Sequence, residues 1–80
     1  MKNIREIITI DNEIQNGQAV FGGTRVPVET LFEHLEAGVS LDDYLADFPS
    51  VKKELAIAVL EIARKILSAR NLVKLYETAA

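Results

Sequence analysis

The sequence has no cysteine and no tryptophan, only two prolines, and a single histidine among its 80 residues. Without cysteine the chain can form neither disulfides nor cysteine-ligated zinc sites, and this composition suits a reducing compartment. No apolar run approaches the ~20 residues that span a bilayer. The start of the chain, MKNIREII, also lacks the apolar core of a signal peptide. We therefore expect a cytoplasmic protein with no membrane association.

Groups suited to catalysis are equally scarce. His34 is the only histidine, and Gly38 stands at i+4, where a second metal ligand would be needed. There is no Ser-His-Asp ordering and no pair of carboxylates on a predicted rigid wall. The aspartates of one short helix (Asp42, Asp43, Asp47) are better explained by capping and by the helix dipole than by a divalent ion. We expect a protein that is not an enzyme and holds no metal or cofactor, with His34 at the surface or half-buried.

The two parts of the chain differ in the sign of their charge. The net charge is −3, but residues 1–50 hold three basic and nine acidic residues, net −6, whereas residues 51–80 hold six basic and three acidic residues, net +3. An acidic chain binds phosphate backbones poorly unless its basic part gathers on one face or is doubled in a dimer. The charge pattern permits nucleic-acid binding without requiring it.

A strong helical pattern runs from Gly38 to Leu60. Ser40 is a good N-cap, and apolar residues then recur at i, i+3, i+4 and i+7 until Pro49 ends the helix (Leu41, Tyr44, Leu45, Phe48). Ser50 is expected to cap a second and longer helix. A join this short predicts two helices that cross steeply, as in a helix-turn-helix.

The N-terminal part predicts two short strands. Ile4–Ile10 is rich in β-branched residues, and Ala19–Phe21 is a second candidate strand. Gly22 and Gly23 supply the positive-φ freedom that a tight turn needs. Pro27 suits the first turn of a further helix. The predicted fold class is mainly α, a bundle of three helices with a short N-terminal strand pair and a long C-terminal helix.

Apolar residues nearly encircle the helix that follows Val51. One helix face cannot hold them all, and a domain of this size buries only about 60% of its unfolded surface, so few other elements can cover them. We expect a homodimer, with an interface that contains Leu55, Val59, Ile62 and Ile66. Two continuations stay open, a rod of roughly 40 Å ending near Glu77 or a break at Asn71. We predict a single domain, with a strand and loop region (1–26), a three-helix core (27–69) and a C-terminal extension (70–80).

The run from Gly17 to Ala63 resembles the bacterial domain-of-unknown-function family 433, with ITID (Ile8–Asp11) in front of it. The most specific parts are GTRVPV (Gly23–Val28), AGVS (Ala37–Ser40) and FPS (Phe48–Ser50). The resemblance implies a homeodomain-like three-helix fold preceded by small strands. It also implies a role as the antitoxin of a toxin-antitoxin pair, often beside a PIN-like nuclease toxin. Gln18 and Ala19 depart from the Lys-Pro or Arg-Pro that commonly stands there, which removes a basic contact.

Two groups of residues are candidate binding sites. Candidate DNA contacts are Arg25, Ser50, Lys52 and Lys53, because a helix-turn-helix presents the start of its second helix to the major groove. That helix lacks the Arg, Asn or Gln cluster that reads base edges, and Arg25 suits an ion pair with an acidic side chain equally well. Candidate contacts to a toxin are Arg70, Leu72, Val73 and Tyr76. The alternative hypothesis is a small dimeric protein-protein adaptor that does not bind DNA.

Overall fold

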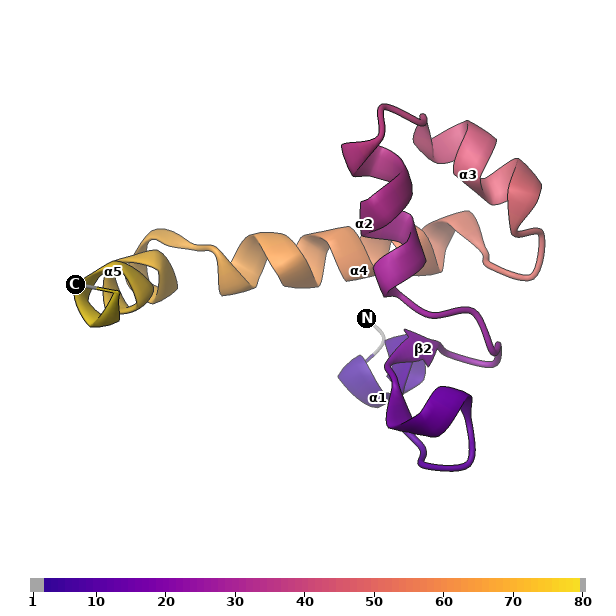
Figure 1. The fold of residues 1–80 in the computed structure, drawn as a ribbon, viewed down its shortest axis with the longest axis horizontal. Coiled ribbons are helices and arrows are strands. Elements are labelled where there is room, and N and C mark those ends of the chain that lie inside the picture. The colour runs from indigo at the N-terminus through magenta and orange to yellow at the C-terminus, as the bar shows by residue number, and fades with distance from the viewer. Residues whose placement is uncertain (1–2, 80) are drawn as a thin grey trace.

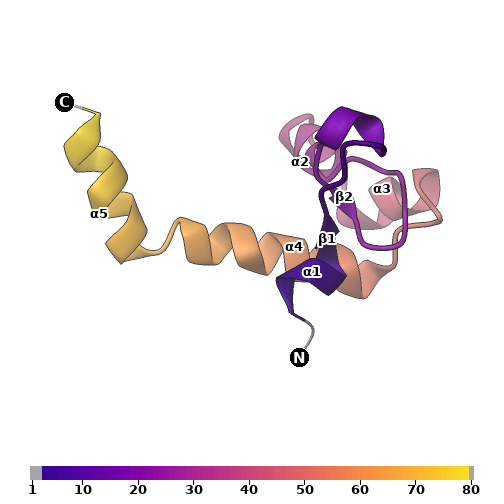
Figure 2. The same ribbon diagram turned by 90° about the horizontal axis from the view of Figure 1, so that it is seen from below.

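The computed structural model describes residues 3–79, which are mainly helical. In chain order the elements are α1 (Ile4–Ile7), β1 (Ile8–Thr9), the 3-10 helix η1 (Gln15–Gly17), β2 (Val20–Phe21), α2 (Glu29–Glu36), α3 (Leu41–Asp47), α4 (Lys53–Ile66) and α5 (Ala69–Thr78). Figures 1 and 2 show the strands, α1, α2 and α3 gathered around the first half of α4. The second half of α4 and α5 extend away from them. The predicted mainly α class with a short strand pair is confirmed.

The N-terminal segment begins as a helix, so the predicted strand Ile4–Ile10 is wrong in its first half. The Asn3 side chain accepts hydrogen bonds from the N–H groups of Arg5, at 2.9 Å, and Glu6, at 3.2 Å. This cap starts a four-residue helix in spite of the β-branched side chains. The strand starts at Ile8 and pairs antiparallel with β2. The predicted second strand is confirmed over Val20–Phe21.

A tight turn follows β2 at the two glycines, as predicted, but only one of them needs a positive φ. Gly23 has φ +75°, whereas Gly22 lies so close to the backbone carbonyl of Glu6 that any Cβ there would clash with it. The Gly22 N–H donates to the Ile7 carbonyl at 2.8 Å. The turn therefore ties α1 to the end of β2.

The α2–α3 corner and the start of α3 follow the predicted signals. Gly38 has φ +85°, and the N–H groups of Gly38 and Val39 donate to carbonyls of the last turn of α2. This is the Schellman arrangement, which needs a glycine-like conformation at that position. Ser40 Oγ accepts from the Asp43 N–H at 3.1 Å and caps α3. The helix ends at Asp47, two residues before Pro49.

The start and end of the long helix differ from the prediction. Ser50 does not cap α4, because the residue at the N-cap position is Lys52, which makes no side-chain cap hydrogen bond. Val51 is buried in the turn before α4, and its N–H donates to the Phe48 carbonyl at 3.0 Å. The helix ends at Ile66, so the predicted rod to Glu77 is wrong. The alternative break at Asn71 is wrong as well, because Asn71 lies within the next helix, α5.

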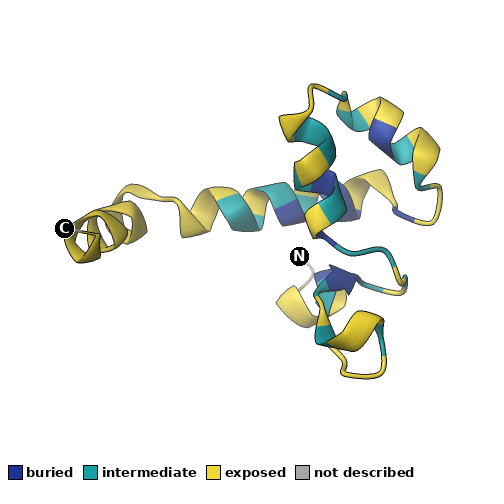
Figure 3. Ribbon diagram, viewed as in Figure 1, coloured by how far each residue is buried: buried dark blue, intermediate teal, exposed yellow. Residues whose placement is uncertain are grey.

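One apolar core joins every element around the first half of α4 (Figure 3). Its buried members are Ile7, Phe21, Val28, Leu31, Tyr44, Val51, Leu55, Ala56 and Val59. No residue of α5 belongs to this core. A membrane-crossing helix is absent from residues 3–79, because none of the helices there combines the required length and apolar character.

Candidate functional site

The start of α4 carries the predicted DNA contacts, and acidic groups lie beside them. Lys52 and Lys53 are exposed, but Lys53 Nζ lies 3.4 Å from Asp42 Oδ1 of α3. Lys52 lines a hollow of 340 Å³ together with Glu6 and Glu54. Basic and acidic side chains thus alternate here, which weakens the local positive potential.

Arg25 is exposed just after the glycine turn. Within residues 3–79 its side chain makes neither a hydrogen bond nor an ion pair, so the ion pair considered from the sequence is not formed. The Gly22–Gly23 turn, two residues before Arg25, lines the same hollow as Lys52. The exposed Ser50 precedes the lysines in the turn between α3 and α4. Ser50, Lys52 and Lys53 thus lie together at the start of α4, and Arg25 follows a turn that shares a hollow with Lys52.

The C-terminal arm, which we define as Leu67 to Thr78, is exposed along its whole length. Four residues of α5 recur at i, i+3, i+4 and i+7 and form one apolar stripe (Ala69, Leu72, Val73, Tyr76). Leu72 and Val73 expose about half of their surface, 51% and 53%, and Tyr76 exposes 81%. Arg70 belongs to the polar side of the same helix. The predicted partner-binding residues thus lie on one bare helix.

The predicted dimer residues fall into two groups. Leu55 and Val59 are buried within the chain, 9% and 3% exposed, so they offer no surface to a partner. Ile62 is partly buried against the core, and Ile66, beyond the end of the core, is 56% exposed. Of the four predicted dimer residues, only Ile62 and Ile66 leave surface that another chain can contact.

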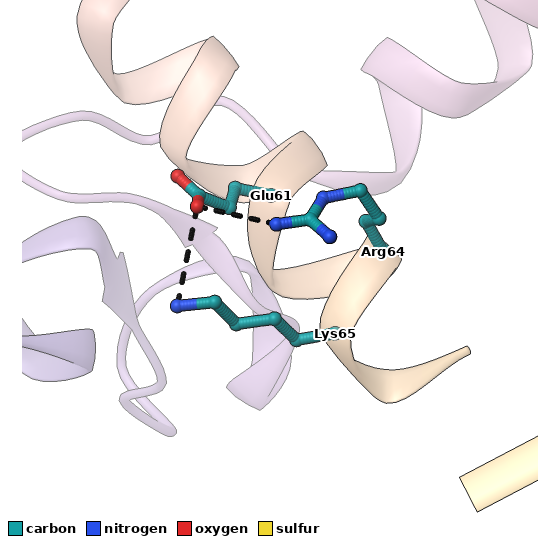
Figure 4. A network of polar contacts seen from close by, with 3 residues as sticks. All are labelled: Glu61, Arg64 and Lys65. Carbon is teal, nitrogen blue, oxygen red and sulfur yellow. Dashed lines mark hydrogen bonds and ion pairs between the residues drawn. The ribbon is translucent and has the colours of Figure 1, made fainter. Parts of the chain in front are cut away.

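A groove between α1 and α4 had no signal in the sequence, because Ile4–Ile7 has the composition of a strand. It encloses 310 Å³ and is lined by Ile4, Ile7, Glu54, Ala58, Glu61, Ile62 and Lys65. Glu61 Oε1 lies 3.4 Å from Arg64 Nη2 and 4.0 Å from Lys65 Nζ. Figure 4 shows the two basic side chains reaching the same carboxylate. The α1/α4 groove thus has an apolar floor and a charged rim.

Polar groups inside the core have structural partners. Tyr44 Oη lies 2.9 Å from Thr30 Oγ1, which itself donates to the Pro27 carbonyl at 2.7 Å. Burial raises the pKa of Tyr44 above its ordinary value, and the hydrogen bond with Thr30 lowers it by less. His34 is half-buried, as predicted, with Nδ1 2.6 Å from the Thr30 carbonyl oxygen and its ring edge-on to those of Tyr44 and Phe48.

Residues 3–79 contain no group of three His, Cys, Asp or Glu side chains arranged to hold a metal ion.

Residues 8–63 match the model of the family described as protein of unknown function (DUF433). The chain belongs to this family. The DUF433 match covers most of the chain and confirms the resemblance carried by the GTRVPV, AGVS and FPS segments. It includes both strands, α2, α3 and most of α4, while α1 and α5 lie outside it. Comparison with curated proteins and with solved structures found no match.

Proposed function

We propose that this DUF433 protein is the antitoxin-like member of a bacterial toxin-antitoxin pair and acts by binding, not by catalysis. The observation that carries the proposal is the bare apolar stripe of α5. A ten-residue helix is marginal in water on its own, and exposed apolar stripes of this kind are a common way to bind a protein groove. The antitoxin role itself comes from the family resemblance.

The proposed partner of the arm is a toxin, a PIN-like nuclease, encoded beside this protein in the cytoplasm. Leu72, Val73 and Tyr76 would enter an apolar groove of the toxin, and Arg70 would meet an acidic side chain at its edge. The test is titration calorimetry with the product of the adjacent gene. Leu72→Asp with Tyr76→Asp should abolish binding, whereas Ile57→Asp, at an exposed residue of α4 away from the arm, should leave it intact. Equal binding by all three proteins would contradict the proposal.

A second part of the proposal assigns operator DNA to the helix-turn-helix. Helices α2, α3 and α4 would form a homeodomain-like unit, with Ser50, Lys52 and Arg25 at the phosphate backbone. Lys53 is held by Asp42 and contributes less. Gel-shift titrations at several salt concentrations give the slope of the logarithm of the binding constant against the logarithm of the salt concentration. Lys52→Ala should reduce the magnitude of this slope by about 0.9 per site. Lys53→Ala should reduce it by less. Base preference should stay the same in both variants, because phosphate contacts do not read sequence.

The alternative is a protein-protein adaptor that does not bind DNA, and it is favoured by the acids beside the lysines. Asp42 pairs with Lys53, while Glu6 and Glu54 share the hollow with Lys52. Nonspecific phosphate contacts are strongest at low salt. If the unmutated protein gives no shift of its own upstream DNA even there, the adaptor function replaces operator binding and the toxin-binding proposal is unaffected.

A further inference from the structure

The α1/α4 groove is a receptor-like surface with no occupant among residues 3–79. Its floor is formed by Ile4, Ile7, Ala58 and Ile62, and Ile4 still exposes 59% of its surface. Glu54 and Glu61 place two carboxylates on the rim, although Glu61 also pairs with Arg64 and Lys65 of its own helix. Lys65 lies at the end of the groove nearest α5. An apolar floor with acidic edges fits an amphipathic helix that carries basic side chains beside its apolar stripe.

The arm of this same chain has the properties that such a groove requires. The stripe residues Leu72, Val73 and Tyr76 are bare, and Arg70 and Lys74 lie beside them, one turn apart. At ~1.5 Å per residue, a ten-residue helix is about 15 Å long, and the groove runs about 17 Å along α4, from Glu54 to Lys65. The arm and the groove therefore match in length, polarity and charge sign.

The charges of the whole chain follow the same division. Residues 1–61 hold five basic and eleven acidic side chains, net −6, and residues 62–80 hold four basic and one acidic, net +3. Opposite charge favours association and sets its register. The complement to the basic arm is thus present on every copy of the chain.

The corner between α4 and α5 keeps the arm away from its own groove. Asn71 Nδ2 donates to the Lys65 carbonyl at 3.0 Å and lies 3.4 Å from Ser68 Oγ, which is within hydrogen-bond distance. The Ser68 N–H also donates to the Lys65 carbonyl, at 3.1 Å. In both Figures 1 and 2 the arm leaves the end of α4 at a steep angle and does not run back along it. A second copy can supply an arm that the chain's own corner directs outward.

We propose that α5 of one copy packs in the α1/α4 groove of a second copy, and that the two chains exchange arms reciprocally. A two-fold exchange uses the same pair of surfaces twice, which makes the interface self-complementary. It replaces Leu55 and Val59, which the core uses, with Ile62 and the arm as the dimer surface. This proposal concerns the chain alone and does not rest on toxin binding. Where both occur, the toxin and the groove compete for α5.

The absence of cysteine makes a crosslinking test clean. Ala58 lies near the middle of the groove floor and Val73 near the middle of α5, so their contact does not depend on the direction in which the arm enters. Ala58→Cys protein mixed with Val73→Cys protein should form a disulfide-linked dimer of about twice 8.9 kDa under mild oxidation. The matched control replaces Ala58→Cys by Ile57→Cys, an exposed neighbour on α4 that does not line the groove, and should link far less.

The double variant Ala58→Cys with Val73→Cys separates exchange from folding back. Linked dimers support the proposal, whereas a disulfide closed within one chain would show that the arm fills its own groove and would overturn it. Absence of any linkage, with a monomer mass by light scattering at micromolar concentration, would also overturn it. Binding of the toxin to that monomer would leave the proposed function standing, so the two failures are distinguishable.

Charge reversal tests the acidic rim independently. Arg70→Glu with Lys74→Glu should raise the dimer dissociation constant about tenfold or more, because like charges then meet at the rim. Addition of Glu54→Lys and Glu61→Lys to the same chain should restore the original value. A reversal without effect, or a loss that the compensating pair does not repair, would contradict pairing between arm and groove.

Discussion

At the scale of single residues, Tyr44 connects helices α2 and α3. Its ring is fully buried and stacks on Phe48, with ring centroids 4.7 Å apart, while its hydroxyl meets Thr30 of α2. Thr30 has already given its proton to the Pro27 carbonyl, so the Tyr44 hydroxyl is the donor in this pair. One polar atom is thus placed in the core with its partner fixed.

We expect Tyr44→Phe to lower the free energy of unfolding by about 1 kcal/mol, the usual net value of a hydrogen bond. It should also change the pH dependence of stability. Because burial raises the pKa of Tyr44, the neutral phenol is favoured in the folded state. The stability that this adds is present below the ordinary tyrosine value of ~10 and is lost as pH rises through the raised pKa.

Urea unfolding at neutral and alkaline pH measures both effects. The loss of stability above pH ~10 should be smaller in Tyr44→Phe than in the unmutated protein. Tyr76→Phe is the matched control, since Tyr76 is 81% exposed and should behave like the unmutated chain. An alkaline slope that is the same in Tyr44→Phe and in the unmutated chain would remove the role assigned to the buried phenol.

At the scale of elements, the sequence predicted helix ends correctly where a residue acts on the backbone of its own turn. Gly38, Ser40 and Pro49 each act within one turn of chain, and the α2–α3 corner and both ends of α3 were predictable from them. Ser50 failed as a cap because Val51 packs into the core, 4% exposed, and its burial sets where the turn ends. Packing between distant elements is not encoded in a local pattern.

The same limit explains the candidate site. The apolar residues around α4 correctly indicated that the helix is covered on several sides, but Leu55 and Val59 are covered by the chain itself. At the break after Ile66 the Lys65 carbonyl accepts from the Ser68 N–H and from the side chain of Asn71, six residues later, a contact that no local pattern indicated. The groove depends on α1, which the cap at Asn3 forms from strand-like residues. The apolar and basic residues of the arm could be picked out from the sequence. That they are exposed could be seen only from the folded structure.

The two serines flanking α3 provide a paired test of capping. We expect Ser40→Ala to cost about 1 kcal/mol, because it removes the acceptor for the Asp43 N–H. Ser50→Ala should change stability by less than about 0.5 kcal/mol, as for an ordinary surface substitution, since Ser50 caps no helix. Thermal unfolding of the two variants checks this. Equal losses in both would mean that Ser50 has the capping role that its position in the sequence indicated.

At the scale of the whole molecule, side-chain packing is uneven along the chain. The first half of α4 is surrounded by α1, α2, α3 and the strands, whereas the arm has only its own hydrogen bonds and the corner at Asn71 (Figure 3). Amides in the core open only with global unfolding, and amides of a bare helix open with almost no cost. The arm therefore has little packing within residues 3–79 to stabilise it.

Hydrogen exchange of the full chain, measured as a function of its concentration, tests this division. Amides from Leu55 to Val59 should exchange slowly at every concentration, because the core of one copy protects them. Amides of α5 should exchange within seconds in dilute solution and become protected as dimers form, by mass action. Leu72→Asp should keep α5 unprotected throughout without changing the α4 amides. Protection of α5 that is already complete in a dilute monomer would instead place the arm on its own chain, and the outward corner would then be one of two conformations.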